Sequence, residues 1–81
     1  MSTVDLRALV LPPRVWAQVM NLLASIEVAE SVQSLNFAAY HAQGFVLGLE
    51  TSAGFAAADI EALYIGFDTA AMHRREALRG A

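Results

Sequence analysis

The sequence predicts an all-α fold, in which a long helix and a shorter helix pack as an antiparallel helical hairpin that dimerises into a four-helix arrangement. Three observations support this prediction. Neither Pro nor Gly occurs from residue 14 to residue 43, so nothing in that stretch obliges a helix to end. Apolar residues recur at helical spacing on both sides of residues 51–54. Those four residues, Thr-Ser-Ala-Gly, have the composition of a turn.

Residues 1–11 precede the helices and form an N-terminal arm. Apolar and polar residues alternate in its first half, which is typical of a strand, but Leu9 and Leu11 break the alternation. The ends of a domain are often poorly ordered unless another element holds them. We therefore assign residues 1–11 to an arm that is extended or disordered, and residues 12–81 to the helical hairpin.

Pro12 and Pro13 suit the start of the first helix, because the fixed φ and the missing N–H of proline cost little in a first turn. We place this helix at about residues 13–50. Gly44 and Gly48 lie one turn apart near its end, and such a pair allows close packing of a second helix at the closed end of the hairpin. Because each glycine weakens a helix by about 0.8–1 kcal/mol, a break or kink near Gly44 is the competing interpretation.

The second helix, at about residues 56–79, is shorter than the first. At 1.5 Å per residue the two helices would span about 57 Å and about 36 Å, so roughly the first 14 residues of the long helix are uncovered. The stretch from residue 15 to residue 26 has no charge, and stable exposure of such a surface invites aggregation. The residues that we expect to form a dimer or partner interface there are Val15, Trp16, Val19, Met20, Leu22, Leu23 and Ile26.

The apolar pattern of the long helix changes register near residues 28–32. A first stripe ends at Ala29 and a second begins at Val28, and we interpret the offset as the point where the helix exchanges one packing partner for another. The first stripe would pack in a homodimer, whereas Trp16, Met20 and Leu23 would serve either the same homodimer or a foreign protein. The sequence leaves these two uses open.

Charged residues predict how the two helices of the hairpin are aligned. Folding the chain at its turn brings the arginines near the C-terminus beside two glutamates in the middle of the first helix. Exposed pairs of this kind contribute only about 0.2–1 kcal/mol each, so they would set the register more than the stability. The predicted salt bridges join Glu27 and Glu30 to Arg74, Arg75 and Arg79.

Composition limits the classes of function. The chain has 81 residues, 57% hydrophobic and 16% charged, and no cysteine, so association with another chain is the expected source of extra stability. The net charge of −3 argues against nucleic acid as the main ligand, because phosphate binding requires clustered Lys and Arg. The uncharged run at residues 31–49 contains several polar side chains, which argues against membrane insertion. We expect a cytoplasmic protein, because the N-terminus lacks the pattern of an export signal.

No constellation of residues predicts catalysis. A metal site needs three or four converging ligands, and the hairpin does not bring His41 and His73 together. The acidic residues are spread along exposed faces, whereas general acid–base catalysis needs two groups around one substrate. We therefore predict no catalytic, cofactor-binding or metal site, no small-molecule substrate and no enzymatic activity.

The closed end of the hairpin reads Gly44-Phe45-Val46-Leu47-Gly48-Leu49-Glu50, and it is followed by Ala62-Leu63-Tyr64 and Arg74-Arg75-Glu76-Ala77-Leu78. A short acidic two-helix chain with these segments resembles small bacterial and phage anti-activators that act on quorum-sensing regulators. The resemblance covers about residues 35–79 and rests on architecture and on common residue types. It implies a helical dimer that occupies the dimerisation or ligand-domain surface of a transcription factor and inactivates it, and it assigns no functional residue.

Together these observations predict a non-catalytic protein–protein interaction module, a homodimeric regulator that binds and inhibits a protein partner such as a transcription factor. Two alternatives stay open. One is a nucleic-acid-binding helical module that uses Arg74, Arg75 and Arg79. The other is a structural subunit of a phage or plasmid assembly.

Overall fold

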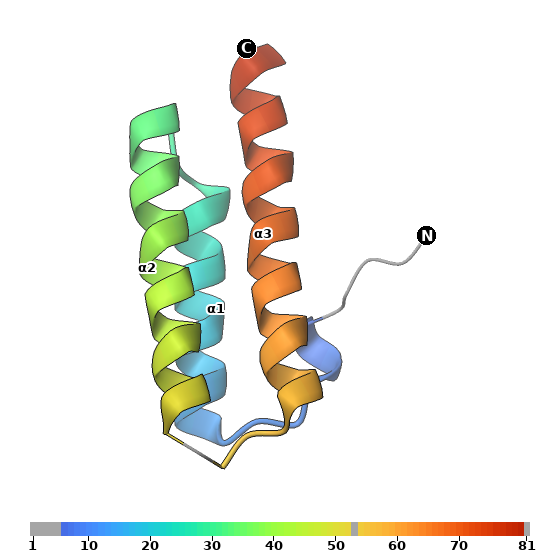
Figure 1. Ribbon diagram of the computed structural model, residues 1–81. Helices are drawn as coiled ribbons and strands as arrows, with labels where there is room; N and C mark the ends of the chain where they lie inside the picture. The colour runs from blue at the N-terminus through green and yellow to red at the C-terminus, as the bar shows by residue number, and fades with distance from the viewer. Residues whose placement is uncertain (1–5, 53, 81) are drawn as a thin grey trace.

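The computed structural model describes residues 6–52 and 54–80, and this part of the chain is all-helical (Figure 1). The helices lie side by side, with α2 running antiparallel to both α1 and α3. The predicted all-α class is confirmed, but three α-helices take the place of two. The elements are a 3-10 helix, η1 (Leu6–Ala8), and the α-helices α1 (Pro13–Glu27), α2 (Val32–Thr51) and α3 (Ala57–Gly80).

The structure corrects the long helix predicted at residues 13–50, because α1 and α2 occupy this stretch and the chain turns back at residues 28–31. Ser31 leaves helical geometry, with φ −144° and ψ 161°, and its side chain caps α2. The N–H of Ser34 donates to Ser31 Oγ at 3.0 Å, and the N–H of Ser31 donates to Ser34 Oγ at 3.1 Å. This reciprocal cap satisfies backbone donors at the helix start, so the chain turns without Pro or Gly.

The turn between α1 and α2 is tied to α3 by two arginines. Arg74 Nε donates to the backbone carbonyl oxygen of Ala29 at 2.7 Å. Ala29 is buried, and a charged donor is a strong partner for a carbonyl group that water reaches poorly. The guanidinium of Arg75 donates to Asn36 Oδ1 in α2 at 2.9 Å. These two hydrogen bonds align α3 with the turn.

The core lies where the three helices meet. Its fully buried side chains include Val19 and Ile26 from α1, Leu35 and Val46 from α2, and Leu63 from α3. Because α1 contacts both other helices, its apolar stripe is covered by its own chain. The uncovered end that was predicted for the first helix is therefore absent. The longest helix is α3, whose 24 residues span about 36 Å and whose C-terminal turn reaches beyond the other helices (Figure 1).

The N-terminal segment packs on α3. Residues 6–8 form η1, and Leu6 is only 6% exposed because it lies against α3. Gly66 makes room for this contact, since a Cβ at that position would lie 2.5 Å from Leu6 Cδ2. Residues 6–8 thus differ from the predicted extended or disordered arm, and residues 1–5 lie outside the described part of the chain.

The turn predicted at residues 51–54 agrees with the structure. The helix α2 ends at Thr51 and α3 begins at Ala57, close to the predicted start of the second helix. Ser52 Oγ donates to the carbonyl oxygen of Leu49 at 2.9 Å and satisfies one acceptor at the end of α2. Gly54 has a φ of 139°, a conformation that favours glycine because it has no Cβ.

Candidate interaction surface

The residues predicted to form a dimer or partner interface lie largely inside the bundle. Val19, Leu22 and Ile26 are no more than 3% exposed and belong to the core. A side chain that is buried in its own chain cannot also be buried in a partner, so these three positions are corrected from interface to core. The other four predicted positions are half-buried: Val15, Trp16, Met20 and Leu23.

The predicted salt bridges between the two ends of the hairpin are replaced by other contacts. Among the described residues, Glu27 and Glu30 form no ion pair within 4.0 Å with the C-terminal arginines. Arg74 and Arg75 donate instead to a backbone carbonyl and to an asparagine side chain. Arg79 lies 3.9 Å from a glutamate of its own helix, and both side chains of that pair are at least 70% exposed. The arginines therefore align α3 without the two glutamates.

Within the described part of the chain, Gly44 and Gly48 do not pack closely against another helix, which corrects their predicted role. The helix α2 also continues through both positions without the alternative break. Both glycines are exposed, and a Cβ built at either one would meet no atom within 4 Å. Alanine at such a position would stabilise the helix by about 0.8–1 kcal/mol. Nothing in the described part of the chain requires these two glycines.

One side of α2 points away from the bundle. Leu35, Ala42 and Val46 form its buried side, and at about 3.6 residues per turn Gly44 lies nearly opposite them. Large apolar side chains surround Gly44 on this outward side. The surface, which we name the α2 outer face, comprises Phe37 (76% exposed), Tyr40 (72%), Leu47 (54%), Gly44 and Gly48.

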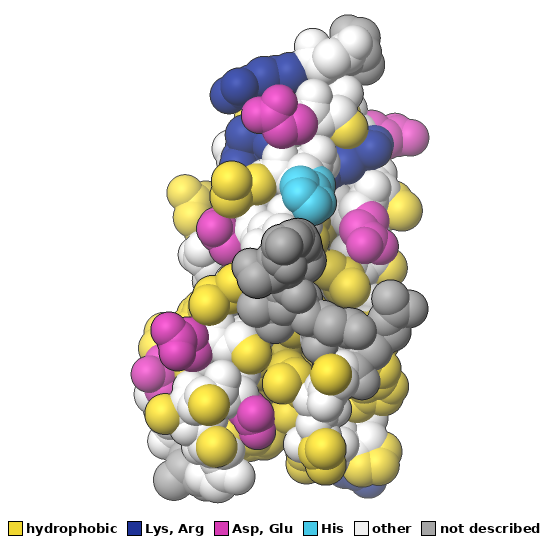
Figure 2. Space-filling view, turned by 90° about the vertical axis from the view of Figure 1, so that its right-hand side faces the viewer, with side chains coloured by type: hydrophobic (Ala, Val, Ile, Leu, Met, Phe, Trp, Pro, Cys, Tyr) yellow, Lys and Arg dark blue, Asp and Glu magenta, His cyan; other side chains and the backbone are white. Residues whose placement is uncertain are grey.

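The α2 outer face carries no charge, because residues 31–49 include no Asp, Glu, Lys or Arg. By contrast, acidic and basic side chains are scattered over the side of the molecule that α3 forms, with arginines gathered toward the end of that helix (Figure 2). Single exposed apolar residues are normal on a monomer, whereas several on one helix face mark a site of interaction. The α2 outer face is therefore the candidate interaction surface.

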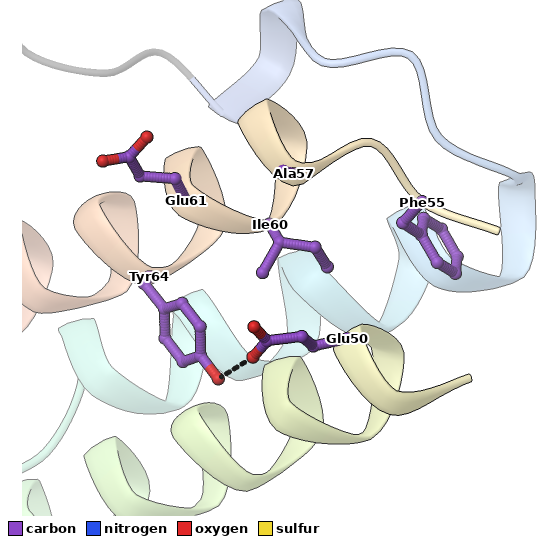
Figure 3. A pocket seen from close by; sticks show the side chains of 6 residues that line it. All are labelled: Glu50, Phe55, Ala57, Ile60, Glu61 and Tyr64. Carbon is purple, nitrogen blue, oxygen red and sulfur yellow. Dashed lines mark hydrogen bonds between the residues drawn. The ribbon is translucent and has the colours of Figure 1, made fainter. Parts of the chain in front are cut away.

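A shallow pocket of about 340 Å³ lies between the end of α2 and the start of α3 (Figure 3). Tyr64 Oη donates to Glu50 Oε1 at 3.2 Å and links the two helices. The Glu61 carboxylate points away from this pair, so the two carboxylates of the pocket do not converge on one substrate. The lining residues are Glu50, Phe55, Ala57, Ile60, Glu61 and Tyr64.

Raising the pH is expected to weaken the fold through Tyr64. Partial burial, the hydrogen bond to Glu50 and the charge of Glu50 together raise the pKa of Tyr64 above its usual 10.0. The folded state then holds the phenol proton more tightly than the unfolded state. This stabilisation is present below about pH 10 and is lost as the pH rises through the folded-state pKa.

Urea titrations at about pH 8 and about pH 11 measure the effect of Tyr64. The free energy of unfolding should fall more in the natural chain than in Tyr64→Phe, which has no proton to lose at this site. Tyr40→Phe removes the hydroxyl of the other tyrosine, which is 72% exposed, and should behave like the natural chain at protein concentrations too low for self-association. Equal decreases in all three proteins would contradict the role assigned to Tyr64.

No helix within the described ranges is both long enough and hydrophobic enough to cross a membrane. Across residues 6–52 and 54–80, no three His, Asp or Glu side chains gather where they would hold a metal ion.

The α2 outer face is absent from the interface predicted from the sequence, although the sequence carries a signal for it. The second apolar stripe contains Leu35 and Ala42 and correctly marks the buried side of α2. Phe37, Tyr40 and Leu47 fall outside that stripe, within a run that has no charge. A helix that is apolar on more than one side has more apolar surface than its own bundle covers. That excess was the available sign of an interaction surface.

Comparison of the chain with protein-family models, with curated proteins and with solved structures found no match. The function is therefore inferred from the chemistry of the α2 outer face.

Proposed function

We propose that this protein is a non-catalytic protein–protein interaction module, a homodimeric regulator that binds and inhibits another protein such as a transcription factor. The observation that carries the proposal is the α2 outer face, where three large apolar side chains are exposed on an uncharged helix surface. Burial of such surface is favourable by about 25 cal/mol per Å². Because self-association would cover the α2 outer face, the half-buried side chains of Trp16, Met20 and Leu23 on α1 are the apolar surface that the pair would offer to its target. A regulator that acts by covering a surface of its target needs no catalytic group.

A protein partner fits this surface better than a nucleic acid does. Phosphate binding draws on free Lys and Arg side chains, and the α2 outer face has none. Arg74 and Arg75 already donate to acceptors within the chain, and Arg79 lies beside a glutamate. These contacts reduce the support for a nucleic-acid-binding module built on the three arginines.

A homodimer that closes on itself also fits the α2 outer face better than an assembly that grows by adding copies. A structural subunit of a phage or plasmid assembly needs two different contact surfaces, so that each added copy offers a new site. When this single apolar face binds the same face of a second copy, the dimer has no such face left to bind a third chain. The mass of the protein in solution distinguishes these two cases.

Sedimentation equilibrium from about 10 µM to about 1 mM tests self-association. The natural chain should approach the mass of two chains. Leu47→Glu should remain monomeric, because the dimer would bury a charge without a partner. Met72→Glu is the matched control, because Met72 on α3 is 55% exposed and Leu47 is 54% exposed. A natural chain that is monomeric throughout would contradict the homodimer, and a larger, growing assembly would favour the structural subunit.

The regulatory part of the proposal needs a second measurement. The immobilised chain should retain a DNA-binding regulator from an extract of the native host. The purified chain should then weaken the binding of that regulator to its own promoter DNA. A retained regulator whose DNA binding does not change would contradict inhibition. Direct binding of the chain to the DNA would favour the nucleic-acid alternative.

A further inference from the structure

We infer that the α2 outer face binds the same face of a second copy of this chain, with the two α2 helices antiparallel and crossing at Gly44. The inference rests on the proposed homodimer and specifies its interface and its geometry. In this arrangement each Tyr40 ring lies over Gly48 of the second copy.

Charge favours a second copy as the occupant of the α2 outer face. The chain has a net charge of −3, and all its charged residues lie outside residues 31–49. Two copies that meet through α2 therefore bury no charged side chain, whereas a meeting through the side that α3 forms would bring acidic and basic side chains into the interface (Figure 2). An anionic membrane or a nucleic acid would need cations that this face lacks.

The shape of the α2 outer face is complementary to the same face of a second copy when the two α2 helices run antiparallel. Tyr40, Gly44 and Gly48 are four residues apart, so they form one row along the helix surface. The row begins with a large side chain that is 72% exposed, and open space lies above its two glycines. When two such rows run in opposite directions with the Gly44 positions facing, Tyr40 of each chain lies opposite Gly48 of the other.

A parallel pair would lose this complementarity. It would set Tyr40 against Tyr40 and Phe37 against Phe37, so the large side chains would hold the two backbones apart and leave space above the glycines. The antiparallel pair fills that space, and rows of four-residue spacing pack at a crossing angle of about −50°. The pair has two-fold symmetry and closes on itself.

The same arrangement explains the two glycines. Gly44 and Gly48 lower the stability of α2, and no contact within the described part of the chain requires either of them. Close approach of a second backbone does require residues without a side chain at the crossing point. The glycines therefore have a role in the pair that they lack in the single chain.

The size of the face sets the expected affinity. A standard interface buries about 800 Å² on each partner, which is roughly a seventh of the 5351 Å² exposed on this chain. One pair of crossing helices buries less than that standard area. We therefore expect a dissociation constant in the micromolar range, and the experiments must extend to high protein concentration.

Filling the space above Gly48 tests the interface. Gly48→Leu should raise the dissociation constant of the dimer about tenfold or more, an effect typical of a central contact. A Cβ at this position meets no atom within 4 Å, and leucine favours helix, so the variant should fold at least as well as the natural chain. Gly80→Leu is the matched control, because Gly80 also faces open space and lies at the end of α3. If Gly48→Leu dimerises like the natural chain, the inference is overturned while the homodimer stands.

Spin labels test the direction of the helices. The chain has no cysteine, so Gln33→Cys gives a single labelling site, and Gln33 is exposed 11 residues before Gly44. Two labels should lie about 30 Å apart in the antiparallel pair and within about 20 Å in a parallel pair. Pulsed electron double resonance at about 1 mM protein measures this distance. A distance within about 20 Å between the two labels would overturn the antiparallel arrangement but not the homodimer. No dipolar coupling between labels, together with the mass of a monomer, would overturn the homodimer as well.

Discussion

Replacing Ile26 with alanine is expected to lower the free energy of unfolding by about 2–5 kcal/mol. Ile26 is 0% exposed, and it lies in α1 where α2 and α3 cover it. The change removes buried methyl and methylene groups and leaves a cavity that the neighbouring side chains fill only in part. A chain of 81 residues has a total stability of about 4–12 kcal/mol, so a large part of it would be lost. Urea unfolding followed by circular dichroism measures the change.

Val28→Ala is the matched control for Ile26→Ala. Val28 lies just after α1 and is 68% exposed, so its truncation should change the stability by less than about 0.5 kcal/mol. Comparing Ile26→Ala with Val28→Ala also distinguishes a core position for Ile26 from the dimer interface predicted from the sequence. If Ile26→Ala kept its stability and only dissociated a dimer, the interface predicted from the sequence would be restored and the three-helix core would be contradicted.

Replacing Gly66 with alanine is expected to destabilise the protein, although alanine is the better helix former. The added Cβ would lie 2.5 Å from Leu6 Cδ2 and 2.7 Å from Leu6 Cγ, so the Leu6 side chain must leave its site on α3. Exposing a buried leucine costs about 1.5–3 kcal/mol, whereas the exchange of glycine for alanine in a helix gains about 1 kcal/mol. The net loss of about 0.5–2 kcal/mol should appear in chemical unfolding.

The effect of Gly66→Ala should reverse its sign when Leu6 is truncated. In a Leu6→Ala background there is no large side chain to displace, so the exchange should stabilise the protein by about 1 kcal/mol. Gly80→Ala, at a glycine that faces open space, should not lower the stability in either background. A Gly66→Ala exchange that stabilises the protein with and without Leu6 would show that η1 does not pack against α3.

Local signals are enough to predict the second turn and the last helix. Thr51 and Ser52 end α2 by donating to carbonyl groups one turn back, and Gly54 adopts a φ of 139°. These are the residue types that favour turns, and each acts through its own conformation or hydrogen bonds. The predicted helix at about residues 56–79 accordingly matches α3 (Ala57–Gly80) within one residue at each end.

The break between α1 and α2 is harder to predict, because part of its cause is distant in sequence. The apolar stripe does shift at residues 28–32, and two separate helices explain the shift, since each can turn its own stripe toward one core. The absence of Pro and Gly nevertheless favoured one continuous helix. The pair Ser31 and Ser34 is a weaker cap signal than Ser followed by Glu. The hydrogen bond from Arg74 to the Ala29 carbonyl joins residues 45 positions apart.

At the candidate site, too, the apolar pattern predicts which residues are buried but not which helix buries them. The apolar pattern predicts that Val19, Leu22 and Ile26 are covered by another helix, and the structure buries all three. A pattern of apolar residues states that a surface must be buried, but it does not name the element that buries it. Here α2 and α3 supply the cover, and the surplus apolar surface lies on the far side of α2.

The order of the helices has a consequence for synthesis of the protein. Within the described part of the chain, α3 contacts η1, α1 and α2, and it follows all of them in sequence. A chain that ends before α3 therefore lacks Leu63 and Phe67, which complete the core against α1 and α2. Such a truncated polypeptide exposes apolar side chains of α1 and α2, and we expect products that stall before α3 to be captured by chaperones or degraded by proteases.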